Sequence, residues 1–306
     1  MSSSSPPASP ARADPHHAPP TGVIGLGDIG RGLAENLRQA GIALCVCDVR
    51  PEATEAYGAA HIAATPRQLA RRCPVVLVAV VTDDQVRAVL RGPDGVFAGA
   101  SAGSAVVIVS TVTTDTVREL HAEGATHGVR VLDCGVSGGP VAAASGELVS
   151  MVGGTAEDVE RVRPVLDAFS CLVLHMGPPG AGLSAKLARN LVQYGSWLAA
   201  FEAQQLAEAA GIDLLKLGEA IKESDKRIGG ASRLMFRTTA EPWPDGTDAG
   251  LLGAMRNGAS LAHKDLVAAL ALGRQLGLHL PLAEMTEARC DAVFGLGPPV
   301  SPVGDA

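Results

Sequence analysis

The fold is decided by residues 21–30, which read Thr21-Gly22-Val23-Ile24-Gly25-Leu26-Gly27-Asp28-Ile29-Gly30. An apolar run leads into three glycines spaced GxGxxG, and an amphipathic segment follows them. In this pattern Gly25 permits the tight turn from strand to helix, Gly27 lets a pyrophosphate approach the backbone, and Gly30 lets the helix pack closely on the strand. Free amides at the helix start then face the phosphates. The stretch therefore predicts a dinucleotide-binding site whose phosphate-binding residues are Gly25, Leu26, Gly27, Asp28, Ile29 and Gly30.

The residues after the glycine motif predict the helix and strand that such a site needs. Leu33 and Leu37 lie at helical spacing, and the apolar run at residues 42–47 ends at Asp48. A carboxylate there accepts hydrogen bonds from the adenosine ribose hydroxyls and repels a 2′-phosphate, so Asp48 favours NAD over NADP. Arg50 keeps NADP open as an alternative, because a guanidinium near the ribose can accommodate that phosphate.

Length and composition exclude several classes of protein. The 306 residues are enough for two domains, and 47% of them are hydrophobic. A net charge of −7 and an aromatic content of 3% argue against nucleic-acid binding, which needs a basic face and stacking side chains. No apolar run reaches the roughly 18 to 20 residues of a membrane span, so we expect no membrane partner. The six cysteines lack CxxC spacing and lie mostly in or beside apolar runs, which indicates buried thiols in a reducing cytoplasm.

The two ends of the chain predict tails. Residues 1–19 are rich in serine and proline and have no periodic apolar pattern, so we expect a disordered tail there. Residues 297–306 are expected to form a second tail. His16 and His17 are candidate metal ligands, but a solvated tail is the preferred interpretation, and no metal site is predicted.

Strands and helices alternate after the first strand-helix-strand unit, which predicts a doubly wound Rossmann domain over residues 20–181. We expect the last parallel strand to end at residue 133 and a loop of small residues to follow at 133–140. The other expected elements are helices at 66–72, 83–90 and 113–123 and strands at 74–81, 104–110 and 129–133.

From residue 182 the pattern changes to helices only. A proline-free stretch predicts one long helix over 182–210 that leaves the sheet. Further helices are expected at 213–223, 260–276 and 282–294, so residues 182–296 form an all-helical second domain in this prediction. Residues 225–259 cannot be assigned to elements. The apolar surface along the long helix indicates an oligomer.

Three further segments predict chemistry. The run from Asp133 to Pro140 offers backbone amides and a serine hydroxyl, which can hold a carboxylate. Lys186 and Asn190 are four residues apart and share one helix face. A lysine can take the proton of an alcohol if burial or a nearby cation lowers its pKa. Lys264, at the start of a C-terminal helix or early in it, can close over a bound cofactor.

These segments together resemble the β-hydroxyacid dehydrogenase family, which includes 3-hydroxyisobutyrate dehydrogenase and tartronate semialdehyde reductase. The resemblance runs from about residue 21 to 290. It rests on GVIGLGDIGRGLAENL (22–37), STVTTDTVREL (110–120), GVSGGPVAAASGELVSMVGG (135–154), KLARN (186–190) and HKDL (263–266).

The resemblance implies roles for the residues that match the family's motifs. Lys186 matches the catalytic lysine, and Asn190 matches the asparagine that helps to position the substrate. The loop that binds the substrate carboxylate is matched by Ser137, Gly138 and Gly139.

On the cofactor side, the resemblance implies that Thr111 lies beside the nicotinamide and that Val80 and Val81 form the turn after the fourth strand. Lys264 matches the cofactor-side lysine of the KDL block, and Gln85 lies where the family often has a cofactor contact.

Three positions depart from the family pattern. Gly135 stands where the DAPVSGG motif usually has proline, Ile29 replaces a common methionine, and Arg189 occupies a place often held by a small or polar residue. The change at Gly135 affects the rigidity of the loop and Ile29 should alter little, and neither change removes a chemical group from the site.

The resemblance implies an enzyme that uses NAD, with NADP as the alternative, to oxidise a small β-hydroxy acid reversibly. A 3-hydroxyisobutyrate-like acid would give its semialdehyde or keto acid, with Lys186 as the base in oxidation and the acid in reduction. A homodimer or homotetramer is the family expectation. An imine reductase that uses NADPH and a non-catalytic NAD-binding scaffold are the alternatives, and a phosphorylated sugar acid would need the basic residues Arg233, Arg237 and Arg256.

Overall fold

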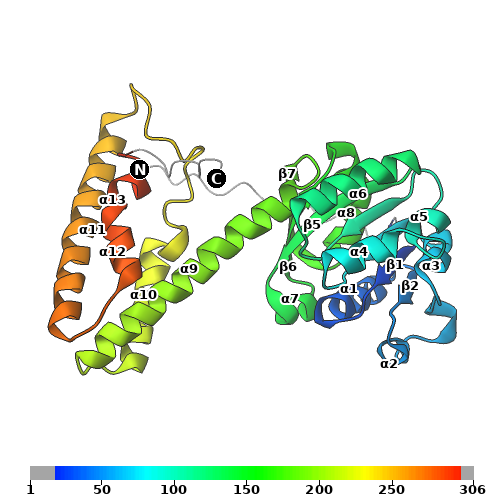
Figure 1. The fold of residues 1–306 in the computed structure, drawn as a ribbon, viewed down its shortest axis with the longest axis horizontal. Helices are drawn as coiled ribbons and strands as arrows, with labels where there is room; N and C mark the ends of the chain where they lie inside the picture. The colour runs from blue at the N-terminus through cyan, green and yellow to red at the C-terminus, as the bar shows by residue number, and fades with distance from the viewer. Residues whose placement is uncertain (1–17, 298–306) are drawn as a thin grey trace. The chain divides into compact units, whose positions relative to one another are not determined.

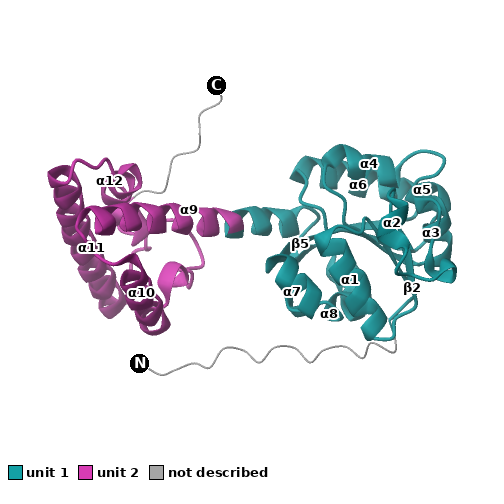
Figure 2. Ribbon diagram, turned by 90° about the horizontal axis from the view of Figure 1, so that it is seen from below, with its two compact units in different colours: residues 1–189 teal, residues 190–306 magenta. Residues whose placement is uncertain are grey.

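The computed structural model describes residues 18–297, which form a mixed α/β fold with a helical C-terminal part (Figure 1). Nearly all of the two predicted tails, and with them the candidate metal ligands His16 and His17, lie outside the described residues. The chain divides into two compact units, residues 1–189 and 190–306 (Figure 2). The division falls inside one long helix, α9 (Ala181–Ala209). The domain boundary expected at residues 181 and 182 stays a prediction.

The first unit is built around a seven-stranded sheet with the strand order β2-β1-β3-β4-β5-β6-β7. Neighbouring strands from β2 to β5 run parallel, β6 runs antiparallel to β5, and β7 runs parallel to β6. The strands are β1 (Thr21–Ile24), β2 (Leu44–Cys47), β3 (Val75–Val78), β4 (Ala105–Ile108), β5 (Arg130–Ser137), β6 (Leu148–Gly153) and β7 (Ser170–Gly177).

Helices cover both faces of this sheet (Figure 1). Successive residues of each strand point to opposite faces. Accordingly Val75 and Leu77 belong to one buried cluster, while Val76 and Val78 belong to the other. The helices of this unit are α1 (Asp28–Gln39), α2 (Pro51–Thr54), α3 (Pro66–Arg72), α4 (Asp83–Leu90), α5 (Val96–Gly99), α6 (Thr114–Thr126), α7 (Gly139–Ser145) and α8 (Ala156–Asp167), with the short 3₁₀ helix η2 (Ala59–His61).

The strand register brings the candidate cofactor residues to one edge of the sheet. Ile24 pairs with both Cys47 and Val78, so β1, β2 and β3 end at the same level. The residues that follow these strands therefore emerge side by side at their carboxyl ends. Open parallel sheets bind their ligands at this edge.

Two expectations for the first unit need correction. Residues 133–137 are not a loop, because β5 continues to Ser137 and its backbone pairs with β6. The sequence interpretation also missed the whole segment α7, β6, α8 and β7. Glycines weaken the strand signal in this region, and the hydrogen bonds to β6 that outweigh this effect come from residues far along the chain.

Residues 190–297, the described part of the second unit, contain helices and no strands. The part of α9 from residue 190 onward is followed by α10 (Leu214–Ile228), η3 (Gly230–Ser232), α11 (Ala249–Gln275), α12 (Pro281–Ala288) and α13 (Cys290–Val293). Asp213 caps α10 by accepting hydrogen bonds from the amides of Leu215 and Lys216. Helix α11 starts at Ala249, whereas we expected a start near 260, so Lys264 lies in the middle of the helix. The helix expected at 282–294 is divided into α12 and α13.

Two general properties of the described residues bear on function. No helix within residues 18–297 is both long enough and apolar enough to cross a membrane, and this stretch contains no cluster of three or more His, Cys, Asp or Glu side chains suited to a metal ion. Five of the six cysteines are buried, but Cys171 is exposed, so the interpretation of buried thiols is wrong for that residue. Cys171 lies on β7, the edge strand of the sheet.

Candidate active site

A pocket of about 570 Å³ lies at the carboxyl ends of β1, β2 and β3. Six of the predicted cofactor residues line it, namely Gly25, Gly27, Asp48, Val80, Val81 and Gln85. Arg50 lines it as well. The structure therefore brings together residues that are up to 60 positions apart in the sequence, and it places them where a doubly wound sheet binds a nucleotide.

The glycine loop has the backbone that its sequence predicts. Gly25 has φ +90°, and a Cβ atom there would lie 2.6 Å from the carbonyl oxygen of Ala79. A Cβ atom at Gly30 would lie only 1.8 Å from the carbonyl oxygen of Gly25, so α1 packs directly on the loop. At Gly27 a Cβ atom would meet no atom within 4 Å, and no side chain caps α1. The loop therefore leaves open space in front of the first amides of α1, which is the space that a pyrophosphate needs.

The other three residues of the predicted phosphate loop differ in exposure. Leu26 is buried, Ile29 is half-buried and Asp28, the first residue of α1, is exposed. The amide of Leu26 donates a 2.6 Å hydrogen bond to Oδ2 of Asp48. This bond ties the glycine loop to the end of β2.

Hydrogen bonds within the protein hold the carboxylate of Asp48 in place. Its Oδ1 accepts hydrogen bonds from the amide of Arg50 at 2.9 Å and from Arg50 Nε at 3.1 Å. Burial raises the pKa of Asp48, but the hydrogen bonds from Arg50 and Leu26 outweigh it and keep the pKa below its ordinary value. The carboxylate is therefore ionised at neutral pH, and the positive charge nearest to it belongs to Arg50.

The turn after β3 forms another wall of the pocket. It follows the third strand of the chain, not the fourth as the resemblance implied for Val80 and Val81. Oε1 of Gln85 accepts hydrogen bonds from the amides of Val81 at 2.8 Å and Thr82 at 3.3 Å, and Thr82 Oγ1 accepts one from the amide of Gln85. This is a capping box at the start of α4. Gln85 thus fixes the turn that carries Val80 and Val81, and Val81 stays exposed beside the pocket.

Thr111 lies exposed in the loop between β4 and α6. One side chain connects this loop to the turn after β3. Oδ1 of Asp83 accepts hydrogen bonds from the amide of Thr113 at 3.0 Å, from its hydroxyl at 2.8 Å and from the hydroxyl of Thr116. Asp83 therefore holds together two of the loops that carry predicted cofactor residues.

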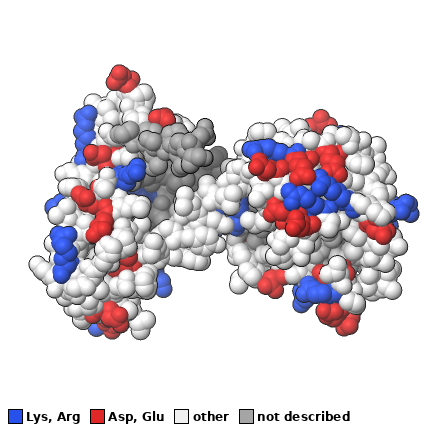
Figure 3. Space-filling view, in the orientation of Figure 1, with Lys and Arg blue, Asp and Glu red and all other residues white. Residues whose placement is uncertain are grey.

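An ion-pair network continues this connection along α4 and α6. Arg87 on α4 and Arg91, the residue directly after this helix, pair with Glu119 and Glu123 on α6. In Figure 3 the adjoining blue and red side chains over these helices show the network on the surface of the first unit. Pairs at the surface stabilise a protein modestly, but a network of several charges fixes the geometry of the two helices better than one pair would.

The predicted carboxylate-binding residues lie at the end of β5. Ser137 is the last residue of the strand and is buried, and it points to the same face as Asp133 and Gly135. Gly138 and Gly139 follow with φ +129° and +69°, values that favour glycine. They form the entry to α7, whose first residue is Gly139.

Lys186 lies in the second turn of α9, directly over β5. A Cβ atom built on Gly135 would lie 2.5 Å from Cβ of Lys186, so the lysine backbone packs against the strand two residues before Ser137. Lys186 is half-buried. Burial, and in addition the charge of Arg189, lower the pKa of Lys186 below its ordinary value. A lysine in this environment exchanges a proton at lower pH than an exposed one.

Two predicted residues belong to the second unit. Asn190 follows Lys186 by four residues on α9, close to one turn of the helix. Lys264 lies on α11 and forms an exposed ion pair with Asp265 at 3.2 Å. Neither residue lines the pocket at the ends of β1, β2 and β3.

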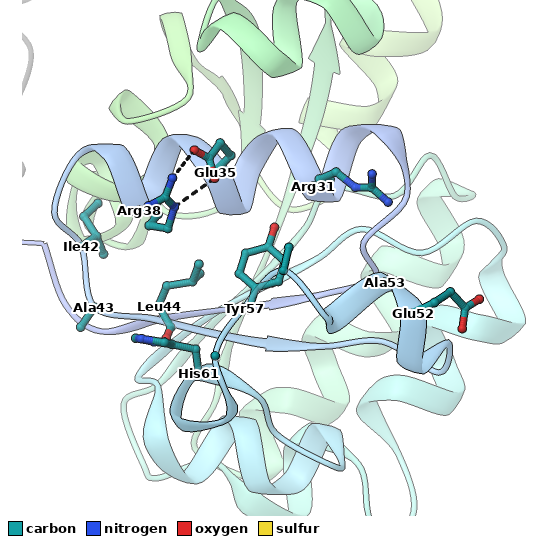
Figure 4. A pocket seen from close by; sticks show the side chains of 12 residues that line it. Arg31, Glu35, Arg38, Ile42, Ala43, Leu44, Glu52, Ala53, Tyr57 and His61 are labelled. Carbon is teal, nitrogen blue, oxygen red and sulfur yellow. Dashed lines mark hydrogen bonds and ion pairs between the residues drawn. The ribbon is translucent and has the colours of Figure 1, made fainter.

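A second cavity, of about 680 Å³, lies between α1, α2 and the start of β2 (Figure 4). Figure 4 shows Tyr57 pointing toward α1, where Arg38 bonds both carboxylate oxygens of Glu35 at 3.0 and 2.6 Å. No residue lines both cavities. Because Leu44 is the first residue of β2, this cavity lies at the amino end of the strand, away from the edge where such sheets bind nucleotides.

Sequence reasoning missed two residues that organise the site, Asp83 and Asp133. Asp133 is fully buried and accepts hydrogen bonds from the amides of Gly180 and Leu183, both at 2.7 Å. The available signal was an aspartate immediately before the run of small residues. Asp83 could have been noticed as an acidic first residue of a predicted helix, but its partners on α6 follow only from the fold.

Comparison with known proteins identifies the family. The family model for the NAD binding domain of 6-phosphogluconate dehydrogenase matches residues 20–177. An uncharacterized oxidoreductase of Mycobacterium tuberculosis is 38% identical over 283 residues, which cover 92% of this chain and 94% of the relative. The NAD-dependent L-serine dehydrogenase of Pseudomonas aeruginosa is 33% identical over 258 residues, covering 83% of this chain and 82% of that enzyme.

Solved structures agree with this result. A putative oxidoreductase from Mycobacterium avium 104 superposes with a TM-score of 0.81 at 34% identity, covering 92% of this chain and 99% of its own. A variant of the imine reductase from Myxococcus stipitatus, in complex with NAD⁺, has a TM-score of 0.74 at 22% identity over 92% of this chain and 95% of its own, and it shares the fold. The expected fold class and family are confirmed: the chain belongs to the β-hydroxyacid dehydrogenase family of NAD(P)-binding oxidoreductases.

Proposed function

We propose that the protein is an NAD-dependent dehydrogenase that reversibly oxidises a small β-hydroxy acid of the 3-hydroxyisobutyrate type, with Lys186 as the proton acceptor. The observation that carries this proposal is the position of Lys186. It packs on β5 two residues before Ser137, and burial and Arg189 lower its pKa. An amine with a lowered pKa next to an oxyanion-binding loop is what oxidation of a hydroxy acid requires.

The residues of the pocket fit a dinucleotide. The open space at Gly27, beside the tightly packed Gly25 and Gly30, leaves room for a pyrophosphate at the start of α1. We infer that Asp48 binds the ribose hydroxyls and that its charge disfavours NADP. When bound, the cofactor supplies the hydride acceptor of the reaction. Val80, Val81 and Gln85 would line its adenosine side, and Thr111 and Lys264 its nicotinamide side.

The substrate would be held by its carboxylate. The hydroxyl of Ser137 and the amides of Gly138 and Gly139 offer hydrogen-bond donors at the end of β5. With the carboxylate there, Nζ of Lys186 takes the hydroxyl proton in oxidation and returns it in reduction, and Asn190 orients the lysine or the substrate. The name of the L-serine dehydrogenase relative supports this class, because serine is itself a β-hydroxy acid.

The alternatives have less support. Lys186 and the acidic Asp48 argue against an imine reductase that uses NADPH, and the presence of Lys186, packed on β5, argues against a scaffold without catalysis. A phosphorylated sugar acid lacks support as well. Arg237 lies over the ring of Trp243 at 5.0 Å and bonds the carbonyl of Glu241, so it is engaged within its own segment.

A panel of substrates separates these functions. Absorbance of NADH or NADPH is followed with short β-hydroxy acids, their aldehydes or keto acids, and cyclic imines, with both cofactors in parallel. The proposal predicts turnover of at least one β-hydroxy acid and faster turnover with NAD than with NADP. Turnover of imines alone, or NADH binding with no turnover on any substrate, would contradict it.

We also infer that the protein is a homodimer or homotetramer. Apolar side chains on α9 are exposed at positions spaced alternately four and three residues apart, the spacing of helices that pair with each other. These residues are Leu187, Leu191, Tyr194, Leu198 and Phe201. Among the described residues of the second unit, the buried hydrophobic side chains are only Ala207, Ala259, Leu280 and Cys290.

A further inference from the structure

The start of α9 is seated on the backbones of β5 and β6 with almost no side chain between them. A Cβ atom on Gly182 would lie 2.4 Å from the carbonyl oxygen of Met151, and one on Gly153 would lie 2.2 Å from Oδ1 of Asp133. On the strand side, a Cβ atom on Gly135 would lie 2.8 Å from the carbonyl oxygen of Gly182. Three glycines from separate elements thus allow this contact, and we call Gly135, Gly153 and Gly182 the helix seat.

Asp133 anchors the helix in this seat. Its Oδ1 accepts a 2.7 Å hydrogen bond from the amide of Gly180, and its Oδ2 accepts one of 2.7 Å from the amide of Leu183. The first amides of a helix lack partners within the helix, so a carboxylate that binds the amide of Leu183, together with that of Gly180 just before α9, stabilises this end. The side chains of Asp133 and Leu183 are both fully buried, so the first turn is held by a polar anchor and by the core.

Successive residues on one face of β5 contact successive parts of the start of α9. Asp133 meets Gly180 and Leu183, and two residues further along the strand Gly135 meets Gly182 and Lys186. Two strand residues span about 6.6–6.8 Å, while the contacts on α9 advance by two or three residues, about 3–4.5 Å. The next residue on this face of β5 is Ser137, so the backbone of Lys186 packs on the strand two residues before that serine.

Gly135 makes this approach possible. The family that this chain resembles usually has proline at this position. A proline ring in place of the Gly135 hydrogen would occupy the space that holds Cβ of Lys186. That atom lies on the backbone side of the lysine and cannot rotate away, so the helix itself would have to move. The residue at position 135 thus limits how closely α9 can approach β5 at Lys186.

We infer that Asp133 and Gly135 are positioning residues for Lys186: Asp133 fixes the first turn of α9, and Gly135 sets how closely its second turn approaches the strand. This inference rests on the proposed function, which makes Lys186 the proton acceptor. It goes beyond that function because neither residue needs to touch the substrate or the cofactor. The seat also keeps Lys186 half-buried, the condition that lowers its pKa.

Two variants of the full chain test the seat. Asp133→Asn keeps the size of the side chain but replaces one acceptor with a donor, so one of the two amides loses its partner. Gly135→Ala adds the Cβ atom that Lys186 excludes. Gly58→Ala is the matched control, because a Cβ atom at Gly58 would meet no atom within 4 Å.

The first measurement determines the pKa of Lys186 directly. Reaction of Lys186 with trinitrobenzenesulfonate is followed by mass spectrometry of its peptide from pH 6 to pH 11, which gives the pKa of the amine without any turnover. In Asp133→Asn and Gly135→Ala the first turns of α9 move away from the strand, so Lys186 is better solvated and its pKa rises by about half a unit or more. The control should keep the wild-type curve.

Turnover and cofactor binding provide the second measurement. Because displacement of a catalytic group by about 1 Å can cost two orders of magnitude, kcat should fall about tenfold or more in both variants. The dissociation constant of NADH, from its fluorescence, should stay within about twofold of wild type, since the pocket at β1, β2 and β3 is untouched.

Two results would overturn the inference. One is an unchanged Lys186 titration curve with unchanged kcat. The other is that kcat and NADH binding fall by the same factor while the labelling curve of Lys186 in the folded molecules stays unchanged. Asp133 and Gly135 would then have a purely structural role. A failure of the proposed function gives a different result. Lys186→Ala would then turn over normally, while the labelling curves would still show whether the helix seat controls the pKa of Lys186.

Discussion

In the proposed function, the choice between the two cofactors depends on one side chain, the carboxylate of Asp48. In Asp48→Ala the ribose hydroxyls lose a charged acceptor, and hydrogen bonds to charged groups contribute about 1.5–3 kcal/mol. We expect KM for NAD to rise about tenfold or more while KM for NADP changes less. The ratio of kcat/KM for NAD to that for NADP, from initial rates, measures this change.

Glu52→Ala is a suitable control for that ratio, because Glu52 is an exposed carboxylate on α2 and does not line the cofactor pocket. An unchanged ratio in Asp48→Ala would show that the carboxylate plays no part in cofactor choice, and Arg50 would then need to be considered in its place.

Arg189 gives the site a predictable pH dependence. Its positive charge lowers the pKa of Lys186, in addition to the larger effect of burial. In the proposed mechanism the base in oxidation is the neutral amine of Lys186, so we expect activity to rise as the pH passes the pKa of Lys186. In Arg189→Gln the pKa of Lys186 rises, and the acid limb of the kcat/KM profile for oxidation should move to higher pH.

Arg161→Gln, a change of a half-exposed arginine on α8, controls for the loss of one positive charge. The profile of the control should match wild type. If the acid limb of Arg189→Gln stays in place or moves to lower pH, Arg189 does not act on the group that titrates.

At the scale of elements, Asp83 joins α4 to α6. It accepts three hydrogen bonds from Thr113 and Thr116, one of them from a buried residue. Each is worth about 0.5–1.5 kcal/mol, and solvent weakens those at the surface, so Asp83→Ala should lower the free energy of unfolding by about 1–2 kcal/mol. Urea denaturation measures this difference.

The neighbouring residue gives a matched control. Asp84 lies beside Asp83 on α4, is almost fully exposed and has one long ion pair with Arg87 at 3.4 Å. Asp84→Ala should change the free energy of unfolding by less than about 0.5 kcal/mol. Equal effects of the two substitutions would mean that Asp83 acts only as a charge near the start of α4.

Helices α3 and α4 were predictable from sequence, whereas the start of α11 was not, although Asp248 caps it. Helix α4 covers residues 83–90 as predicted, and Thr65 caps α3 as predicted, because a cap is a local interaction. Helix α11 starts eleven residues before the expected residue 260 and contains Gly250, Gly253 and Gly258, which lower helix propensity locally. Packing against α12 and α13 supports the helix there.

Some residues of the candidate site could also be predicted from sequence, and others could not. The glycine loop and Asp48 could be placed from a short motif and its spacing, because one strand-helix-strand unit contains them. Ser137 and Lys186 were singled out as a hydroxyl in a run of small residues and a lysine on a helix face, and the family resemblance implied their roles. The role of Asp133 could not be predicted, because its two partner amides lie 47 and 50 residues further along the chain.

For the molecule as a whole, the exposed apolar positions on α9 predict self-association. We expect size-exclusion chromatography with light scattering to give the mass of a dimer or tetramer at micromolar concentration. Leu191→Asp with Leu198→Asp places two charges in that stripe and should shift the mass toward the monomer of 31.1 kDa. Lys222→Asp on α10 controls for the change in charge, and a monomeric wild-type protein would contradict the prediction.

The central claim is that Lys186 takes the proton of a β-hydroxy acid, and turnover by Lys186→Ala tests it most directly. The rate of NADH formation is measured on the best acid of the panel, together with the dissociation constant of NADH. Removal of a general base costs about a hundredfold or more, so kcat should fall by that factor while NADH binding stays near wild type. Turnover close to wild type in Lys186→Ala would contradict the account.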